Sequence, residues 1–182
     1  IFQRRDAGKT WKCMGLEENK TIHRICMDGH DNVYAAAMGS AWGPNPDRGV
    51  FYYNVALGQW KKILFVNDST GCADLVMDPL NDQKLFAAMW QYERKPWNFN
   101  SGGKGSGLHM TVDGGTTWKR LGEKEGLPKG HLGRVGIAIA PSNSRVVYAM
   151  IESKVTALYK SEDGGANWKM VTDKGVGDRP FY

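Results

Sequence analysis

The sequence predicts an all-β protein, a β-propeller fragment built from four-stranded antiparallel blades. Two eight-residue segments, 111–118 and 161–168, nearly repeat each other, and both combine an Asp-Gly-Gly run with a final Trp. Two more worn copies keep the Trp, which leaves tryptophans spaced by 49, 58 and 50 residues: Trp11, Trp60, Trp118 and Trp168. Self-similarity at about 40–50 residues is typical of propellers and solenoids.

The repeated segments have the composition of tight turns between strands. Glycines can take positive φ, and an Asp carboxylate can accept hydrogen bonds from backbone N–H groups further along the turn. A Ser or Thr hydroxyl can join this network, and the Trp can cover the turn. We therefore expect a structural role, not a catalytic one, for Asp6, Trp11, Trp60, Thr111, Asp113, Gly115, Trp118, Ser161, Asp163, Gly165 and Trp168.

Short runs of β-branched and aromatic residues between turn residues predict the strands. The most complete repeat predicts them at 135–140, 146–151, 157–160 and 168–171. Alignment on the tryptophans makes residues 1–182 a single partial propeller: a blade end (1–15), three blades (21–66, 70–122 and 132–172) and the start of another (173–182). Propellers close with about 4–8 blades. We expect the remaining blades to come from further chain or from an assembly.

Composition narrows the classes of function. The hydrophobic content of 41% and charged content of 24% are those of a soluble globular domain, and no apolar run is long enough to span a membrane. The net charge of +5 is scattered, so nucleic-acid binding is not expected. Three cysteines without C-x-x-C spacing, Cys13, Cys26 and Cys72, are expected as buried free thiols. We predict neither a metal site nor a cofactor.

Two long loops are the best candidates for ligand contact. Propeller loops between second and third strands open on the face opposite the Asp-Gly-Gly turns, and here they span 39–48 and 90–106. Loops of 17 residues are often functional. Exposed aromatic rings beside polar groups bind sugars or peptides, whereas rings that fold inward would only pack the loop. The candidates are Trp42, Trp90, Tyr92, Arg94, Trp97 and Phe99, with Trp97 and Phe99 as the main anchors.

Charged residues near the starts of the first strands are the second group of candidates. They are Arg24, Asp74, Arg134, Asp178 and Arg179, and the blade alignment makes Arg24 and Asp74 equivalent. An inner ring of Arg and Asp can hold an acidic ligand or perform acid–base chemistry. It can also be a set of ion pairs that ties the blades together. We expect Arg24, Asp74 and Arg134 to form the floor of a binding site, and Arg179 to be a further ligand-binding residue.

The turns also match a family pattern, S/T-x-D-x-G-x-x-W. Together with segments 37–51, 94–103, 132–143 and 177–182, they make the chain resemble the BNR/Asp-box propellers, and among these the sortilin-like, glycosyl-hydrolase-labelled proteins of bacteria. The resemblance covers nearly the whole chain. It implies a propeller of seven or more blades in a larger protein that is extracytoplasmic or secreted.

The same resemblance implies two functions. Sortilin relatives bind peptides or proteins, whereas enzymatic relatives include sialidases and xyloglucan-cleaving endoglucanases. The R-T-D-I/V-G-G-type catalytic segment of the endoglucanases corresponds to 37–42 (AMGSAW), which has no Asp. Glycosidases need two carboxylates about 5–9.5 Å apart, and the sequence nominates no such pair. We expect a propeller that binds a peptide, protein or glycan at the channel mouth; the alternative is a glycoside hydrolase with carboxylates partly in other blades.

Overall fold

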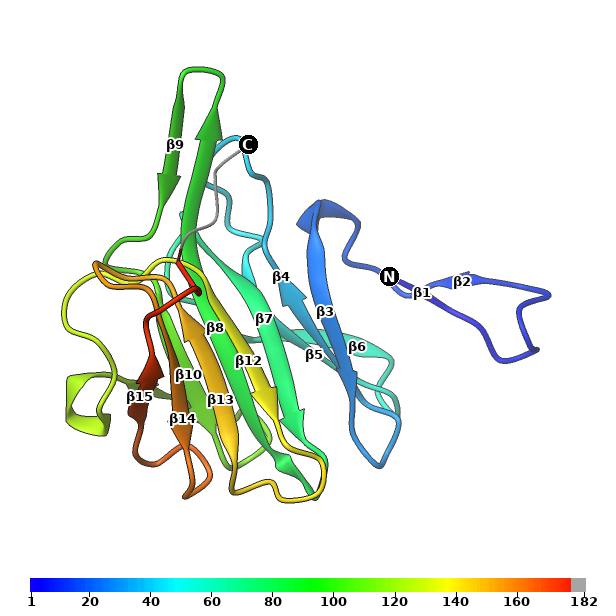
Figure 1. Cartoon of the computed structure of the whole chain (residues 1–182). Helices are drawn as coiled ribbons and strands as arrows, with labels where there is room; N and C mark the ends of the chain where they lie inside the picture. Colours follow the sequence, from blue (N-terminus) through cyan, green and yellow to red (C-terminus); the bar gives the residue numbers. More distant parts are fainter. Residues whose placement is uncertain (178–182) are drawn as a thin grey trace.

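The computed structural model describes residues 1–177 and confirms the all-β prediction with antiparallel sheets (Figure 1). The chain opens with a two-stranded ribbon, followed by three sheets that we call blades 1, 2 and 3. The ribbon consists of β1 (Phe2–Gln3) and β2 (Lys12–Cys13). The two short 3-10 helices are Glu17–Asn19 and Glu123–Glu125. Neither helix is long or apolar enough to cross a membrane, within residues 1–177.

Each blade is a meander of strands in chain order. Blade 1 contains β3 (Ile22–Met27), β4 (Val33–Ala37), β5 (Gly49–Asn54) and β6 (Gln59–Leu64). Blade 2 contains β7 (Thr70–Asp78), β8 (Asn81–Lys95), β10 (Gly107–Thr111) and β11 (Lys119–Leu121), and β9 (Asn98–Ser101) pairs with the far part of β8. Blade 3 contains β12 (Val135–Ile139), β13 (Val147–Ile151), β14 (Ala157–Ser161) and β15 (Lys169–Thr172).

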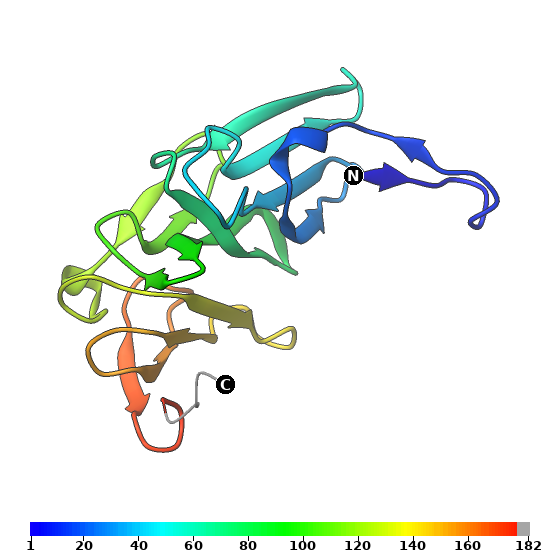
Figure 2. The ribbon, with the colours of Figure 1, turned by 90° about the horizontal axis from the view of Figure 1, so that it is seen from above.

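The blades stand side by side along an arc, with the ribbon projecting beyond one end of it (Figure 2). The first strand of blade 2, β7, lies between β3 and β12 and contacts both. Antiparallel order then places the connections at two opposite ends. The turns between first and second strands and between third and fourth strands form the turn end. The connections between second and third strands form the mouth end.

Apolar side chains fill the spaces between the blades. Residues on β8 alternate between the two spaces: Leu85, Ala87 and Met89 face blade 1, whereas Phe86 and Ala88 face blade 3. This alternation follows from the two-residue period of a strand. Because both faces of β8 are covered by neighbouring blades, its sequence is a continuous apolar run over residues 85–90. Its small Ala residues allow neighbouring sheets to approach closely.

The two repeat turns, 111–118 and 161–168, share the hydrogen bonds of their Ser or Thr and Asp side chains but differ at the Trp, since Trp118 Nε1 is buried without a partner within residues 1–177. In the second, the Ser161 hydroxyl donates to Asp163 Oδ1 (2.8 Å) and accepts from the Gly165 N–H (2.8 Å). The Asp163 carboxylate accepts from Asn167 N (2.9 Å) and Nδ2 (2.8 Å), and Trp168 Nε1 donates to the Gly165 carbonyl (3.0 Å). Thr111, Asp113, Gly115 and Thr117 repeat the Ser161–Asn167 bonds in the first turn.

The two worn copies keep part of this arrangement. Asp6 accepts from Thr10 N (3.0 Å) and Oγ1 (2.6 Å), as Asp113 does from Thr117. Three tryptophans lie at the start of a blade's fourth strand, since Trp60 is the second residue of β6 and Trp118 and Trp168 directly precede β11 and β15. Trp11 directly precedes β2, the second strand of the ribbon. The burial of the four tryptophans differs, since Trp168 is 4% exposed and Trp11 is 60% exposed.

Two expectations from the sequence are wrong in detail. Cys72 is buried and Cys26 is half-buried, but Cys13 is exposed on the short ribbon, where its thiol donates to Glu17 Oε1 (2.9 Å). Residues 90–101 do not form an irregular loop, because β8 continues to Lys95 and β9 returns beside it. Arg179 and Asp178 lie outside the described residues, as does half of the expected start of a further blade.

Candidate functional site at the mouth end

A β-hairpin projects from blade 2 beyond the other strands at the mouth end (Figure 1). Its strands pair from Tyr92 opposite Ser101 to Lys95 opposite Asn98, which leaves Pro96 and Trp97 as the turn. Trp97 is 81% exposed at this tip. The alternation of large and polar residues over 90–95 is the signal that could have revealed the strand from sequence, because strands place every second residue on one face.

The other three aromatic rings of the hairpin pack against one another. The centroids of Trp90 and Tyr92 lie 4.3 Å apart, and those of Tyr92 and Phe99 lie 5.5 Å apart in an edge-to-face arrangement. Trp90 is buried and forms a small cluster with Met38 and Ala73. Of the two roles expected for the aromatic residues, packing applies to three rings, which hold the hairpin in place. Exposure applies to Trp97, which faces solvent.

Blade 3 holds the base of the hairpin through one carboxylate. Glu152 Oε2 accepts from Ser101 Oγ (2.8 Å) and from the backbone N–H of Arg134 (2.8 Å). Ser101 Oγ in turn accepts from Trp90 Nε1 (3.1 Å). Three polar groups that would otherwise lack partners at this junction are thus satisfied together. Sequence reasoning did not identify Glu152, since its partners are remote in the chain.

Blade 1 holds the hairpin through a buried arginine that sequence reasoning also missed. Arg48 is fully buried, and its guanidinium donates to four carbonyl oxygens: Ser40 (2.6 Å), Gly43 (3.1 Å), Ser69 (2.7 Å) and Tyr92 (3.2 Å). The planar, multidentate donor fork of Arg suits such a set of acceptors. One side chain therefore joins loop 39–48, the start of β7 and the hairpin. The Arg94 N–H adds a further bond to the Ala41 carbonyl (2.8 Å).

Although Glu152 and Arg48 hold the hairpin and loop 39–48 in place, a few large side chains at this end remain exposed to solvent. Trp42, on loop 39–48, is 66% exposed and follows Ala41, the residue bonded to the hairpin. Arg94 is exposed on the hairpin itself. Trp42, Arg94 and Trp97 thus form an exposed surface on a backbone held from both sides, which we call the rim.

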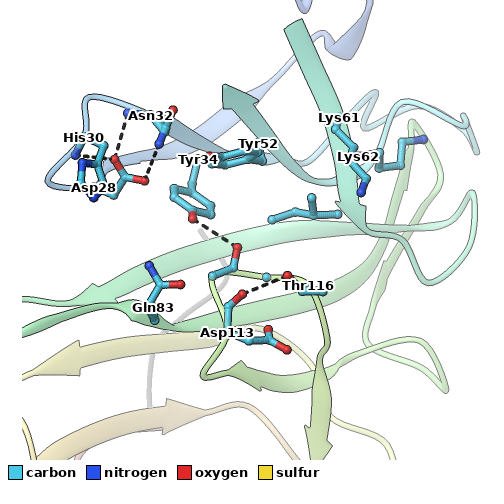
Figure 3. A pocket seen from close by; sticks show the side chains of 13 residues that line it. Asp28, His30, Asn32, Tyr34, Tyr52, Lys61, Lys62, Gln83, Asp113 and Thr116 are labelled. Carbon is cyan, nitrogen blue, oxygen red and sulfur yellow. Dashed lines mark hydrogen bonds between the residues drawn. The ribbon is translucent and has the colours of Figure 1, made fainter. Parts of the chain in front are cut away.

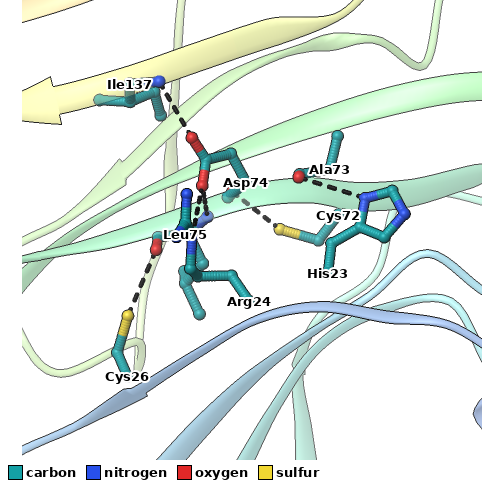
Figure 4. Close-up of polar contacts among 8 residues, drawn as sticks. All are labelled: His23, Arg24, Cys26, Cys72, Ala73, Asp74, Leu75 and Ile137. Carbon is teal, nitrogen blue, oxygen red and sulfur yellow. Dashed lines mark hydrogen bonds and ion pairs between the residues drawn. The ribbon is translucent and has the colours of Figure 1, made fainter.

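Below the rim, one carboxylate links the three blades (Figure 4). Asp74 Oδ1 accepts from Arg24 Nε and from the Leu75 N–H, at 3.1 and 3.0 Å. Its Oδ2 accepts from the Ile137 N–H of blade 3 at 3.1 Å. Arg24 pairs with Ala36 and Asp74 with Ala88, so the two residues occupy equivalent register positions. Asp74 therefore acts here as a structural link.

A shallow opening of about 260 Å³ lies beside this link, between the first strands. His23, Arg24, Asp74 and Arg134 contribute side chains to its lining. Arg134 Cζ lies 5.5 Å from the centroid of the Trp90 ring, which connects the opening to the base of the hairpin. Burial lowers the pKa of His23, and Arg134 lowers it further, so the ring is neutral at pH 7. The opening is thus basic, with two guanidinium groups and one carboxylate.

A second opening, of about 420 Å³, lies at the turn end between blades 1 and 2 (Figure 3). Tyr34 and Tyr52 lie on one side of it, with ring centroids 4.9 Å apart, and Tyr34 donates to the Gly114 carbonyl (3.2 Å). Its carboxylates, Asp28 and Asp113, already accept bonds within their own turns. The sequence analysis did not identify this opening, because its lining comes from segments far apart in the chain.

Three carboxylates at the mouth end already have partners. Asp74 accepts three hydrogen bonds, and Glu152 accepts two. Glu93 lies 3.5 Å from Lys95 Nζ on the hairpin. Residues 1–177 also contain no group of three His, Cys, Asp or Glu side chains placed to hold a metal ion.

Comparison with known proteins identifies the fold but no family. No protein-family model matches the sequence, and no curated protein matches it. Among solved structures, an ancestral GH74 enzyme superposes with a TM-score of 0.64 at 16% identity, over 92% of this chain and 20% of that one. The GH74 enzyme of Niastella koreensis gives 0.61 at 16% identity, over 90% of this chain and 25% of that one.

A third solved structure is YCF48 bound to D1 peptide, with a TM-score of 0.56 at 16% identity over 96% of this chain and 48% of that one. These neighbours are β-propeller proteins, which confirms the propeller fold. The chain spans a fifth to a half of their lengths. At 16% identity, these similarities show the fold and do not show the function of this chain.

Proposed function

We propose that this chain is part of a binding propeller that recognises a peptide, protein or glycan through the rim at its mouth end. The observation that carries the proposal is Trp97, an exposed indole at the tip of a hairpin that two neighbouring blades hold in place. Exposed aromatic side chains on a pre-organised backbone are typical anchors of binding interfaces, because little entropy is lost when they bind.

The state of the carboxylates supports binding over catalysis. A glycosidase needs one carboxyl group free to donate a proton and a second that acts as nucleophile or base. The carboxylate oxygens of Asp74 and Glu152 instead accept hydrogen bonds from backbone and side-chain donors, and these bonds join the blades. Asp74 and Glu152 are therefore poorly suited to act as a catalytic pair.

The neighbours support both candidate ligand classes at the level of fold. YCF48 is seen with a peptide, and the GH74 proteins are enzymes. The repeat turns support membership of the BNR/Asp-box propellers, and the sortilin-like resemblance favours a peptide or protein ligand in an extracytoplasmic protein. Stacking of a sugar ring on Trp97 or Trp42 is the glycan form of the same proposal.

The test is a binding screen with one informative pair of variants. The purified 182-residue chain is applied to peptide and glycan arrays, and dissociation constants are measured for the hits. Trp97→Ala should weaken binding by about 2 kcal/mol, or roughly thirtyfold, as expected for an aromatic anchor. Trp11→Ala is the matched control, because Trp11 is 60% exposed and lies on the ribbon beyond the blades, away from the hairpin (Figure 2). Equal affinity of the parent and Trp97→Ala would contradict the proposal.

The alternative, a glycoside hydrolase, is tested with the same protein. We expect no turnover of an aryl glycoside or of xyloglucan oligosaccharides by this chain, because Asp74 and Glu152 are bonded into links between the blades and segment 37–42 has no Asp. Product formation above a heat-killed control, measured by reducing-sugar release or chromatography, would favour the enzyme.

A further inference from the structure

We propose that the opening between the first strands binds a carboxylate group of the ligand, held between the guanidinium groups of Arg24 and Arg134. The inference rests on the proposed binding function and adds the chemistry that the ligand must carry. An uncompensated basic opening beside the rim is the feature from which it follows.

Donors at this opening are unused. Arg24 bonds Asp74 through Nε alone, so its two Nη groups have no acceptor within residues 1–177, and its side chain is 57% exposed. The Arg134 guanidinium has no acceptor in that range either; it contacts the Trp90 ring by its face. Guanidinium groups bind carboxylates in bidentate geometry, which makes Arg the residue of choice for such ligands.

The protein's own carboxylate cannot neutralise both arginines. Asp74 already accepts from Arg24 Nε and from two backbone N–H groups, and Glu152 is bonded to the backbone N–H of Arg134. Among the residues that line the opening, the two arginines face one carboxylate and the pKa of His23 is lowered, so the lining carries a net charge of about +1. A carboxylate from outside would complete the charge balance.

The third blade leaves room for this group. Gly136 pairs with Met150, the register position that Arg24 and Asp74 occupy in blades 1 and 2. A Cβ placed on Gly136 would meet no atom within 4 Å, so the space in front of it is open. An extra acidic or bulky side chain there would fill or neutralise the opening, and the sequence has none.

The arginine next to the hairpin is held in position before any ligand arrives. The Arg134 backbone is fixed by Glu152, and its side chain contacts Trp90, whose indole N–H is bonded to Ser101. A ligand whose acidic group occupies the opening would continue along the hairpin toward Trp97. The opening would then bind the acidic group of the ligand, and Trp97 would bind an apolar group of the same ligand.

The experiment measures carboxylate binding directly. The 182-residue chain is titrated at low ionic strength with N-acetylglutamate and with glucuronate, and the arginine Nε–H signals are followed by NMR. N-acetylglutamine and glucose are the neutral controls. We expect saturable shifts with at least one acid at concentrations on the order of 10 mM, as for a weak single-group ligand, and none with the neutral analogues. The two acids distinguish a peptide source of the carboxylate from a sugar source.

Arg134→Gln and Arg145→Gln form the matched pair of variants. Both residues are exposed arginines, but Arg145 lies at the turn end. Arg134→Gln should weaken binding of the acid at least about fivefold, and Arg145→Gln should change it less than about twofold, because only the first removes a donor from the opening. Absence of binding by both acids, or equal weakening by the two variants, would overturn the proposal.

One further variant separates this inference from the proposed function. Trp97→Ala removes the tip of the hairpin and leaves the opening intact, so it should not change binding of the small acids. Loss of array binding in Trp97→Ala together with unchanged acid binding supports both proposals. Acid binding that depends on Arg134, in a protein whose array hits ignore Trp97, would support the opening and reject the rim.

Discussion

The two ends of the same three sheets differ in how their polar and apolar groups are used. At the turn end, segments 111–118 and 161–168 repeat one hydrogen-bond pattern, and their second glycines, Gly115 and Gly165, press against Ile63 and Phe86 of the preceding blade. At the mouth end, the connections differ in length and sequence, and Trp42 and Trp97 face solvent. The repeated turns bond their Ser or Thr and Asp side chains within the turn, whereas the variable mouth-end connections leave two indole rings in solvent.

This contrast separates stability from recognition within one scaffold. Gly165 takes a φ of +94°, and an added Cβ would clash with the Phe86 ring, so the turn tolerates only glycine. The hairpin tip has no comparable constraint, because Trp97 contacts solvent on most of its surface. Substitutions at the turn end should therefore reduce stability, whereas substitutions at the rim should reduce binding.

The largest loss of stability is expected on replacement of Arg48, the buried arginine that joins the loops of the mouth end. Arg48→Ala would leave four carbonyl oxygens without their donor and create a cavity, which should cost about 3–5 kcal/mol of unfolding free energy. Urea denaturation measures the loss. Arg48→Lys is the control for charge, since an ammonium group cannot reach the four acceptors together. A loss below about 1 kcal/mol for Arg48→Ala would show that the mouth loops do not depend on this side chain.

The second largest effect is a loss of stability at low pH, caused by a buried histidine in the middle of blade 2. His109 on β10 is buried, its Nδ1 has no hydrogen-bond partner within residues 1–177, and burial, then Arg120, lowers its pKa to about 4. Because the folded pKa is below the unfolded value of 6.5, the unfolded state takes up the proton first as pH falls. Stability should fall between pH 6.5 and 4, by on the order of 3 kcal/mol.

The check is the melting temperature of the parent and of His109→Leu over this pH range. The leucine variant should lose the part of the pH dependence that comes from His109, because it has no group to protonate. The same slope in both proteins would assign the pH dependence to other residues.

A smaller loss of stability is expected at a repeat turn. Ser161→Ala removes the acceptor of the buried Gly165 N–H, which should cost about 1–3 kcal/mol. The neighbouring Glu162→Ala is the control, because Glu162 is exposed and its carboxylate pairs with Lys160 at the surface. Thermal unfolding distinguishes the two, and a matching melting temperature for Ser161→Ala and the parent would argue against the structural role of the turn.

The smallest effect on stability is expected at the rim. Trp97→Ala should change the unfolding free energy by less than about 0.5 kcal/mol, as surface substitutions usually do. Circular dichroism melts measure this directly. A large loss of stability would mean that Trp97 belongs to the packed aromatic set with Trp90, and the contrast between the two ends would weaken.

The sequence predicted the sheets and the turns better than the mouth. The strands of blade 3 lie close to the expected ranges because Asp-Gly-Gly and Pro-Ser-Asn segments punctuate apolar runs of strand length. Such signals are local. The extension of β8 to Lys95 was missed, although its residues alternate, since charged residues and Pro96 were interpreted as a loop.

The polar links of the mouth end could not be predicted from local patterns. Arg48 bonds the carbonyl of Tyr92, 44 residues away, and Glu152 bonds Ser101, 51 residues away. Neither residue has a distinguishing motif, and their partners are backbone or hydroxyl groups with no sequence signature. Repeat alignment made Arg24 and Asp74 equivalent positions, and the structure shows that these positions of neighbouring blades meet at the first strands.

Hydrogen exchange of the chain with and without its best array hit tests the central claim most directly. The account predicts that ligand slows exchange in segments 39–48 and 91–101 and leaves segments 111–118 and 161–168 unchanged. Protection at the turns, or around Tyr34 and Asp113 at the opening on that end, with none on the hairpin, would place recognition at the wrong end of the sheets and contradict it.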